Sequence, residues 1–207
     1  MASPRARLSV DKITAAALQI VDVGGVEALT MRRLGESLGV EAMSIYKHLP
    51  DKGAVLDAMI ATAIGEMRLD QLPARWDDRI RLLGAELRRV ALAHPHLFAR
   101  MATRIPAGID STRHVEVLLG ALHDADLTPD RVTRHFWTCV AYTMGALLAE
   151  TAALTGVGDP AIAAPTGEVA AGPMLVRYGP RLAACEFQRE YRRGLEVQID
   201  AIRAAAR

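Results

Sequence analysis

Two glycines, Gly35 and Gly39, stand four residues apart between segments that are otherwise helical in pattern. Helices joined by a tight turn need a small residue where their backbones approach, and Gly35 can provide it. The turn also needs a residue that tolerates positive φ, which glycine does without steric cost, and Gly39 meets that need. The pattern therefore predicts a helix-turn-helix, whose second helix lies in the major groove of DNA. An ordinary helical hairpin is the alternative. The shared core would consist of Leu34, Leu38, Val40 and Ile45.

Helical periodicity continues along the rest of the chain, and no segment shows the strict alternation of a strand. Aromatic residues make up only 4% of the sequence, which also favours helix over sheet. Residues 155–180 are rich in glycine, proline and alanine and predict a connection, with one helical turn around Glu168. The fold class is therefore all-α. We expect helices over residues 10–23, 31–38, 41–47, 52–67, 76–93, 97–104, 111–124, 129–154 and 181–205.

The charges of the chain nearly cancel, with a formal net charge of +1. An architectural DNA-binding protein needs a strong basic excess, so contacts with DNA must come from local geometry. The two cysteines, Cys139 and Cys185, lie in apolar helical surroundings and are expected to be buried and free. The N-terminus lacks the apolar run of a secretory signal, and no apolar stretch is long enough to span a membrane. We expect a cytoplasmic protein with no membrane partner.

Residues from Val10 to Ile64 resemble the DNA-binding domain of TetR-family repressors. The resemblance rests on the apolar stripe before Gly24-Gly25, then on ALTMRRLGESLGV and SIYKHLPDKGAVLDAM. The remaining chain is most similar to the branch that contains the tetracycline repressor, around Trp76, His94-Pro95 and the Thr103-Arg104 to Pro106 stretch. The resemblance implies a helix-turn-helix domain over residues 1–54 and a helical ligand-binding and dimerisation domain over 55–207. The implied function is that of a ligand-responsive repressor that binds a palindromic operator as a homodimer.

The resemblance also implies which residues face double-stranded operator DNA. Ala42 and Met43 have no polar side-chain atoms and can offer only apolar contact, best to a thymine methyl group. Ser44 can donate or accept a hydrogen bond. Arg32 can reach either a phosphate or a guanine edge, and it can bind the guanine edge with two donors. Arg5 and Arg7 precede the first helix and belong either to a DNA-contacting arm or to a solvated tail. The predicted DNA-binding set is Thr30, Arg32, Ala42, Met43, Ser44, Tyr46, Lys47, His48 and Lys52.

The family fold implies that two long helices of each subunit form a dimeric four-helix bundle. Val132, Phe136, Val140 and Leu147 make one apolar ridge, and Phe187, Tyr191, Leu195 and Ile199 make the other. The alternative is that both ridges pack inside one subunit, because either arrangement fits ridge packing.

A small-molecule effector would occupy a mainly apolar cavity in the larger domain. In the tetracycline-sensing branch a histidine binds the magnesium of the drug, whereas Arg100 stands at that place here. We therefore expect a largely apolar small molecule, with no cofactor and no protein-bound metal. The predicted ligand-binding residues are Leu83, Leu87, Met101, Arg104, Trp137, Tyr142 and Met144.

Two other classes of function compete with the repressor interpretation. An enzyme is disfavoured because His94 and His96 have no nearby carboxylate or cysteine cluster to complete a metal site. The sequence also contains no nucleophile with an associated base motif and no phosphate-binding glycine loop. A redox-responsive regulator that uses Cys139 or Cys185 remains a variant of the repressor interpretation.

Overall fold

The computed structural model describes residues 8–103, 112–156 and 172–206, and these residues contain helices and no strand. The predicted all-α fold is confirmed. The chain divides into two compact units. The N-terminal unit comprises Met1–Met67 and His96–Thr112, and the C-terminal unit comprises Arg68–Pro95 and Arg113–Arg207.

The N-terminal unit is built from α1 (Val10–Gly24), the short 3-10 helix η1 (Val26–Ala28), α2 (Met31–Leu38), α3 (Ala42–Tyr46), α4 (Lys52–Gly65) and α6 (Pro95–Thr103). Local signals in the sequence start and stop these helices. The hydroxyl of Ser9 accepts a hydrogen bond from the Lys12 amide, and the carboxylate of Asp51 accepts one from the Ala54 amide at 2.8 Å. Such caps satisfy amides that have no partner inside the helix. Gly25 ends α1 at φ +74°.

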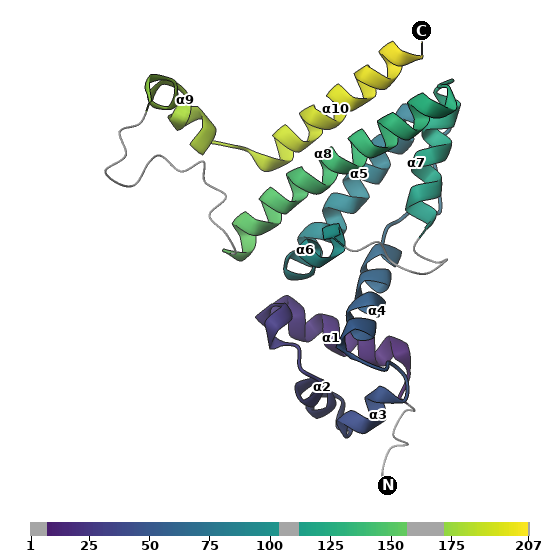
Figure 1. Ribbon diagram of the computed structural model, residues 1–207, viewed down its shortest axis with the longest axis vertical. Helices are drawn as coiled ribbons and strands as arrows, with labels where there is room; N and C mark the ends of the chain where they lie inside the picture. The colour runs from purple at the N-terminus through teal and green to yellow at the C-terminus, as the bar shows by residue number, and fades with distance from the viewer. Residues whose placement is uncertain (1–7, 104–111, 157–171, 207) are drawn as a thin grey trace. The chain divides into compact units, whose positions relative to one another are not determined.

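In the N-terminal unit, α1 packs against both α2 and α4, and α2 packs against α3 (Figure 1). Ile13, Val21, Leu34 and Met59 are fully buried. In α6, Leu97 and Phe98 are also fully buried. The predicted boundary between residues 54 and 55 lies inside α4, which belongs entirely to the N-terminal unit.

The C-terminal unit contains α5 (Trp76–Ala93), α7 (Arg113–Asp124), α8 (Pro129–Thr155), α9 (Pro173–Ala183) and α10 (Phe187–Ala205). Helices α8 and α10 lie side by side, and α5 packs against α7, α8 and α10 (Figure 1). A Cβ atom at Gly194 would lie 2.1 Å from the hydroxyl of Tyr142, so the tyrosine ring from α8 lies directly against this glycine of α10. The core cluster of this unit includes Ile80, Ala121, Leu122, Leu195, Ile199 and Ile202.

The predicted boundary between the connection and the last helix was wrong over residues 173–186. Helix α9 occupies Pro173–Ala183, where the sequence predicted a connection followed by the first turn of the last helix, and α10 begins only at Phe187. Gly179 and Pro180 belong to the glycine- and proline-rich segment that was expected to be a connection, yet both lie inside α9. The predicted turn around Glu168 lies outside the described residues.

A buried carboxylate connects the start of α5 with the end of α10. The side chain of Asp77 is 3% exposed and accepts hydrogen bonds from Arg75 at 2.9 and 3.1 Å. Arg203 of α10 donates to the same carboxylate at 3.1 Å, and Arg81 lies 3.2 Å from it. The hydrogen bond from Arg75 is the largest of the effects that hold the pKa of Asp77 well below its usual range. The ionised form of Asp77 is therefore part of the folded structure.

We expect Asp77→Asn to lower the free energy of unfolding by roughly 2 kcal/mol at pH 7, because hydrogen bonds to a charged group are lost inside the fold. A lowered pKa in the folded state stabilises the protein above the unfolded-state pKa of about 4, and this stabilisation is lost as the pH falls below it. The difference between wild type and variant in urea unfolding should therefore be constant from about pH 5 to 7 and should shrink below about pH 4. Asp200→Asn is the control, because Asp200 is 71% exposed and pairs with the same Arg203. A similar loss in the control would contradict the assignment to Asp77.

Candidate nucleic-acid interface

The turn between α2 and α3 has the geometry that the two glycines predicted. Gly39 ends α2 in the left-handed conformation, at φ +66° and ψ +32°. A Cβ atom at Gly35 would lie 2.7 Å from the carbonyl oxygen of Val40, so a larger residue would push the two helices apart. The Val40 amide donates to the Gly35 carbonyl at 3.0 Å and closes the turn. In the predicted shared core, Leu34 and Ile45 are fully buried, and Leu38 and Val40 are half-buried.

Helix α3 is anchored by one side chain and presents the others to solvent. Ile45 is the only residue of α3 that is buried. Met43 is 66% exposed and Tyr46 is 40% exposed. We call the residues that remain at least partly accessible around this helix the recognition surface: Ala42, Met43, Ser44, Tyr46, Lys47 and His48. A surface with two apolar side chains, two hydroxyls and two basic groups can contact both base edges and phosphates.

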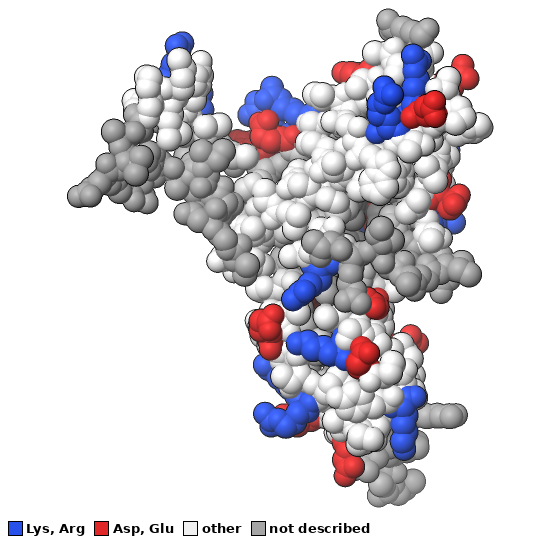
Figure 2. Space-filling model, in the orientation of Figure 1, with Lys and Arg blue, Asp and Glu red and all other residues white. Residues whose placement is uncertain are grey.

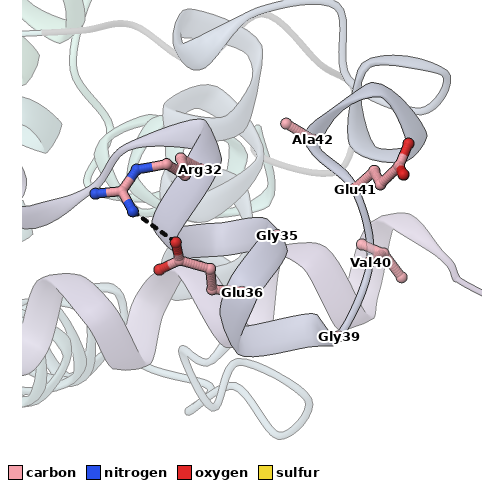
Figure 3. A pocket seen from close by; sticks show the side chains of 7 residues that line it. All are labelled: Arg32, Gly35, Glu36, Gly39, Val40, Glu41 and Ala42. Atoms are coloured by element: carbon pink, nitrogen blue, oxygen red, sulfur yellow. Dashed lines mark hydrogen bonds and ion pairs between the residues drawn. The ribbon is translucent and has the colours of Figure 1, made fainter.

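Arg32 of α2 is highly exposed, and its Nη1 lies 2.7 Å from Oε1 of Glu36 one turn later. Figure 3 shows this ion pair on one side of an open groove, with Glu41 and Ala42 on the other side. Arg32 was predicted to contact DNA, whereas its ion pair with Glu36 was not predicted. The signal that could have found Glu36 is its i,i+4 spacing from Arg32, at which side chains on a helix are neighbours.

The remaining two predicted DNA-binding residues also have roles within the unit. The hydroxyl of Thr30 accepts a hydrogen bond from the Arg33 amide at 3.1 Å and caps α2. Lys52 is half-buried in the first turn of α4, and its Nζ lies 3.5 Å from the carbonyl oxygen of Val26. Both residues therefore help to hold the ends of α2 and α4. Arg5 and Arg7 lie outside the described residues.

Charges on the N-terminal unit are mixed. Figure 2 shows blue and red side chains interspersed over the helices of this unit, with no continuous basic area on the face that is drawn. This agrees with the net charge of +1, which required DNA contacts to come from the placement of a few side chains.

The predicted ligand-binding residues are distributed over both units. Leu83 is buried in α5, whereas Leu87 in α5 and Met144 in α8 are half-buried. Tyr142 donates its hydroxyl proton towards backbone carbonyls of α10, and Trp137 is 58% exposed. Met101 is buried in α6 of the N-terminal unit, and Arg104 lies outside the described residues. The structure therefore places these side chains in different environments, and only the α5 and α8 members share a unit.

A groove in the C-terminal unit lies between α5 and α10. Leu195 and Tyr191 form part of its lining, together with the charged side chains of Arg88 and Arg192. It contains none of the predicted ligand-binding residues. Below it, the hydroxyl of Tyr191 donates to the Gly84 carbonyl at 2.9 Å, and burial raises the pKa of Tyr191 well above its usual range. The described part of the chain brings together no group of histidine, cysteine and acidic side chains that could hold a metal ion.

The two apolar ridges predicted for the dimer interface are partly buried inside the subunit. Leu147 of α8 is fully buried, and no more than 5% of the surface of Tyr191, Leu195 or Ile199 in α10 is exposed. Val132, Phe136 and Val140 of α8 and Phe187 of α10 are half-buried, so packing inside the subunit accounts for only part of the two ridges. The sides of α8 and α10 that remain exposed include Trp137 and Val197.

The two cysteines differ in exposure. Cys139 is buried, as predicted, and burial raises the pKa of its thiol to about 11. Its reactive thiolate form is therefore disfavoured at neutral pH. The prediction that Cys185 is buried was wrong, because this residue lies exposed between α9 and α10. The last helix was expected to include Cys185, and the actual break before Phe187 leaves it outside any helix.

The polypeptide is similar in sequence to known bacterial regulators. It is 36% identical over 145 residues to an HTH-type transcriptional regulator of Saccharopolyspora erythraea, covering 70% of this chain and 61% of that protein. It is 30% identical over 155 residues to the class A tetracycline repressor from transposon 1721 of Escherichia coli, covering 74% of this chain and 72% of the repressor. The alignments span 61% and 54% of the lengths of the first two curated relatives.

Solved structures have the same fold. A possible TetR family transcriptional regulator from Streptomyces coelicolor A3(2) superposes with a TM-score of 0.82 at 28% identity, covering 95% of this chain and 99% of that one. The TetR family protein ActR of Streptomyces coelicolor, in complex with actinorhodin, gives a TM-score of 0.80 at 24% identity, with 97% and 99% covered. No helix among the described residues is long and apolar enough to cross a membrane.

Family domains account for both units. Residues 13–59 match the bacterial regulatory proteins of the tetR family, and residues 70–206 match the tetracyclin repressor-like C-terminal domain. The first match contains the helix-turn-helix and the recognition surface, and the second contains α5 to α10, including α6 of the N-terminal unit. The chain therefore belongs to the tetR family of bacterial regulatory proteins, a family of transcriptional regulators rather than enzymes.

Proposed function

We propose that the protein is a cytoplasmic, ligand-responsive transcriptional repressor that binds a palindromic operator as a homodimer. A largely apolar small molecule releases it from DNA. The observation that carries this proposal is the exposed recognition surface of α3, held on a buried Ile45 by the tight turn at Gly35 and Gly39. The match of the C-terminal unit to the tetracyclin repressor-like domain supports the ligand-responsive part of the proposal.

The recognition surface divides into base-reading and phosphate-binding side chains. Ser44 offers a hydroxyl to a base edge, and the exposed Arg32 offers a guanidinium to guanine. Ala42 and Met43 supply apolar contact to thymine methyl groups. Lys52 lies at the N-terminus of α4, where a positive charge and free amides both favour phosphate. The proposed contacts with the DNA backbone also include Thr30, Tyr46, Lys47 and His48.

A homodimer follows from the size of this surface. A single short recognition helix reads few base pairs, so helix-turn-helix proteins bind two half-sites about one helical turn apart. Helices α8 and α10 bury one side each within the subunit and leave Trp137 and Val197 58% and 63% exposed. Helix α9 exposes Met174 and Val176 as well. Apolar side chains on three helices of one unit are typical of a surface that another subunit covers.

The effector is proposed to contact Leu83, Leu87 and Met144 in the C-terminal unit, because these apolar side chains lie on the facing helices α5 and α8. ActR, which has the same fold, has been solved in complex with the small molecule actinorhodin. Arg100 stands where the tetracycline-sensing branch needs a magnesium-binding histidine, and it lies 4.0 Å from Glu27. A cationic side chain cannot bind Mg²⁺. Met101, Arg104 and Tyr142 are further candidates, whereas the exposed Trp137 is assigned to the proposed dimer surface.

Release from DNA is proposed to occur by a population shift. The effector favours a dimer whose recognition helices are spaced wrongly for the operator. The coupling free energy between effector and DNA then equals the difference in the binding free energy of the effector between this state and the DNA-binding state. Helix α4 belongs to the N-terminal unit and ends three residues before Arg68, where the other unit begins. Helix α6 begins at Pro95 of the C-terminal unit and otherwise belongs to the N-terminal unit. These two helices are therefore the natural carriers of the signal.

Ser44→Ala and Lys52→Ala should affect DNA binding in different ways. We expect Ser44→Ala to reduce the preference between base pairs, because it removes a hydrogen-bonding group. Lys52→Ala should weaken binding to all sequences and reduce the salt slope by about one unit. Fluorescence anisotropy at several salt concentrations measures both effects, with a duplex selected from a random library by the wild-type protein. An unchanged affinity and slope for Lys52→Ala would refute the phosphate assignment.

Introducing an acidic residue on the exposed sides of α8 and α10 should disrupt the proposed dimer. We expect Trp137→Glu and Val197→Glu to shift the mass found by sedimentation equilibrium from two chains towards one, and to weaken operator binding in parallel. Val23→Glu is the matched control, because Val23 of α1 is 84% exposed outside these helices. A wild-type protein that sediments as a monomer at micromolar concentration would argue against the homodimer.

The effector class can be tested by release of the operator duplex in a compound screen. We expect apolar small molecules to release it, and Leu87→Ala to raise the concentration needed severalfold without changing operator affinity, since one lost contact of this kind corresponds to about 1 kcal/mol. Leu72→Ala, a leucine that is 40% exposed outside any helix, serves as the control. Release by magnesium–tetracycline alone would overturn the proposed effector class.

A further inference from the structure

Arg32 and Glu36 form an ion pair on the exposed side of α2, at the edge of the groove that leads to α3 (Figure 3). The distance between Arg32 Nη1 and Glu36 Oε1 is 2.7 Å, and the side chains are 84% and 59% exposed. Within the described part of the chain, this is the only hydrogen bond that the structure gives to the Arg32 guanidinium. The carboxylate therefore engages one nitrogen of the group and leaves Nε and Nη2 available.

A guanidinium held in this way is suited to base reading. Arginine binds guanine through two parallel donors directed at O6 and N7, which requires the planar group to have a defined orientation. An unpaired arginine side chain samples many rotamers, and its charge is attracted to any nearby phosphate. A carboxylate one turn away restricts the rotamers and neutralises part of that attraction. The pair thus favours a directed contact over a nonspecific one.

We propose that Glu36 is a positioning residue for DNA recognition. It holds the guanidinium of Arg32 towards its base and lowers the contribution of Arg32 to sequence-independent binding. Glu36 therefore raises the ratio of operator affinity to nonspecific affinity. This inference rests on the proposed role of Arg32 in reading DNA.

The same groove supplies a matched control. Glu41, which is exposed at the start of α3, also lines it and carries the same charge as Glu36. Its carboxylate makes no hydrogen bond that caps α3, and the described part of the chain shows no ion pair for it. If negative charge near DNA were all that mattered, the two glutamates would behave alike.

The experiment compares Glu36→Gln, Glu41→Gln, Arg32→Ala and the double variant Arg32→Ala/Glu36→Gln. Each full-length protein is titrated with three kinds of duplex. The first is the duplex selected by the wild type, the second is a series in which each guanine of that duplex is substituted in turn, and the third has a random sequence. We expect Glu36→Gln to lower the ratio of affinity for the selected duplex to affinity for the random duplex roughly twofold. A change of this size is what the loss of an exposed i,i+4 ion pair would produce. Glu41→Gln should leave this ratio unchanged, even if binding to both duplexes becomes tighter.

The double variant distinguishes a role of Glu36 in orienting Arg32 from a general effect of its negative charge on DNA binding. In the Arg32→Ala background, Glu36→Gln should no longer change the ratio, because there is no guanidinium to position. Equal effects of Glu36→Gln and Glu41→Gln, or an effect that persists without Arg32, would overturn the proposal. Circular dichroism and melting temperature confirm that each variant is folded.

Failures of the two proposals can be told apart. If Arg32→Ala changes the response to a guanine substitution and Glu36→Gln does not, then only the positioning role is wrong. If Arg32→Ala leaves the response to every substitution unchanged, then both the base-reading role of Arg32 and the role of Glu36 are wrong. The assignments to Ser44 and Lys52 would still stand in either case.

Discussion

The close approach of the backbones of α2 and α3 at Gly35 determines the arrangement of the whole recognition surface. A Cβ atom at this position would come within 2.7 Å of the Val40 carbonyl oxygen, and no ordinary side chain fits there. This approach, with the left-handed Gly39 after it, lets Leu34 and Ile45 be buried together. Once Ile45 is buried, helical periodicity leaves Met43, Tyr46 and Lys47 at the surface. Function in this unit thus depends on a steric constraint rather than on a large basic field.

The C-terminal unit depends on a different balance of forces. Its apolar core between α5, α7, α8 and α10 is supplemented by buried ionic contacts, of which Asp77 with its arginines is one and Glu150 with Arg88 is another. Both pairs connect helices that are far apart in sequence. A carboxylate that is nearly inaccessible to water is retained only with charged partners. These pairs therefore constrain which helices can lie next to one another, in addition to the apolar contacts.

Local signals in the sequence were sufficient for most helices. The caps at Ser9, Thr30 and Asp51 and the stops at Gly25 and Gly39 act within a few residues, so their outcome does not depend on the rest of the fold. The failure was at α9, where Gly179 and Pro180 weaken a helix locally and the chain is helical nevertheless. The exposure of Cys185 followed from the same error. The ion pair between Arg32 and Glu36 was not predicted, although the i,i+4 spacing of the two residues was visible in the sequence.

By itself, the sequence determined the all-α class, the helix-turn-helix, the family and the burial of Ile45 in α3, because each of these follows from spacing along one or two neighbouring helices. Only the tertiary structure decided which sides of α8 and α10 are buried within the subunit, and that Trp137 is exposed while Tyr142 lies against α10. It also decided that α4 and α6 belong to one unit. Periodicity reports that a helix has an apolar side and does not report which partner covers it, since that choice depends on contacts between residues far apart in the chain.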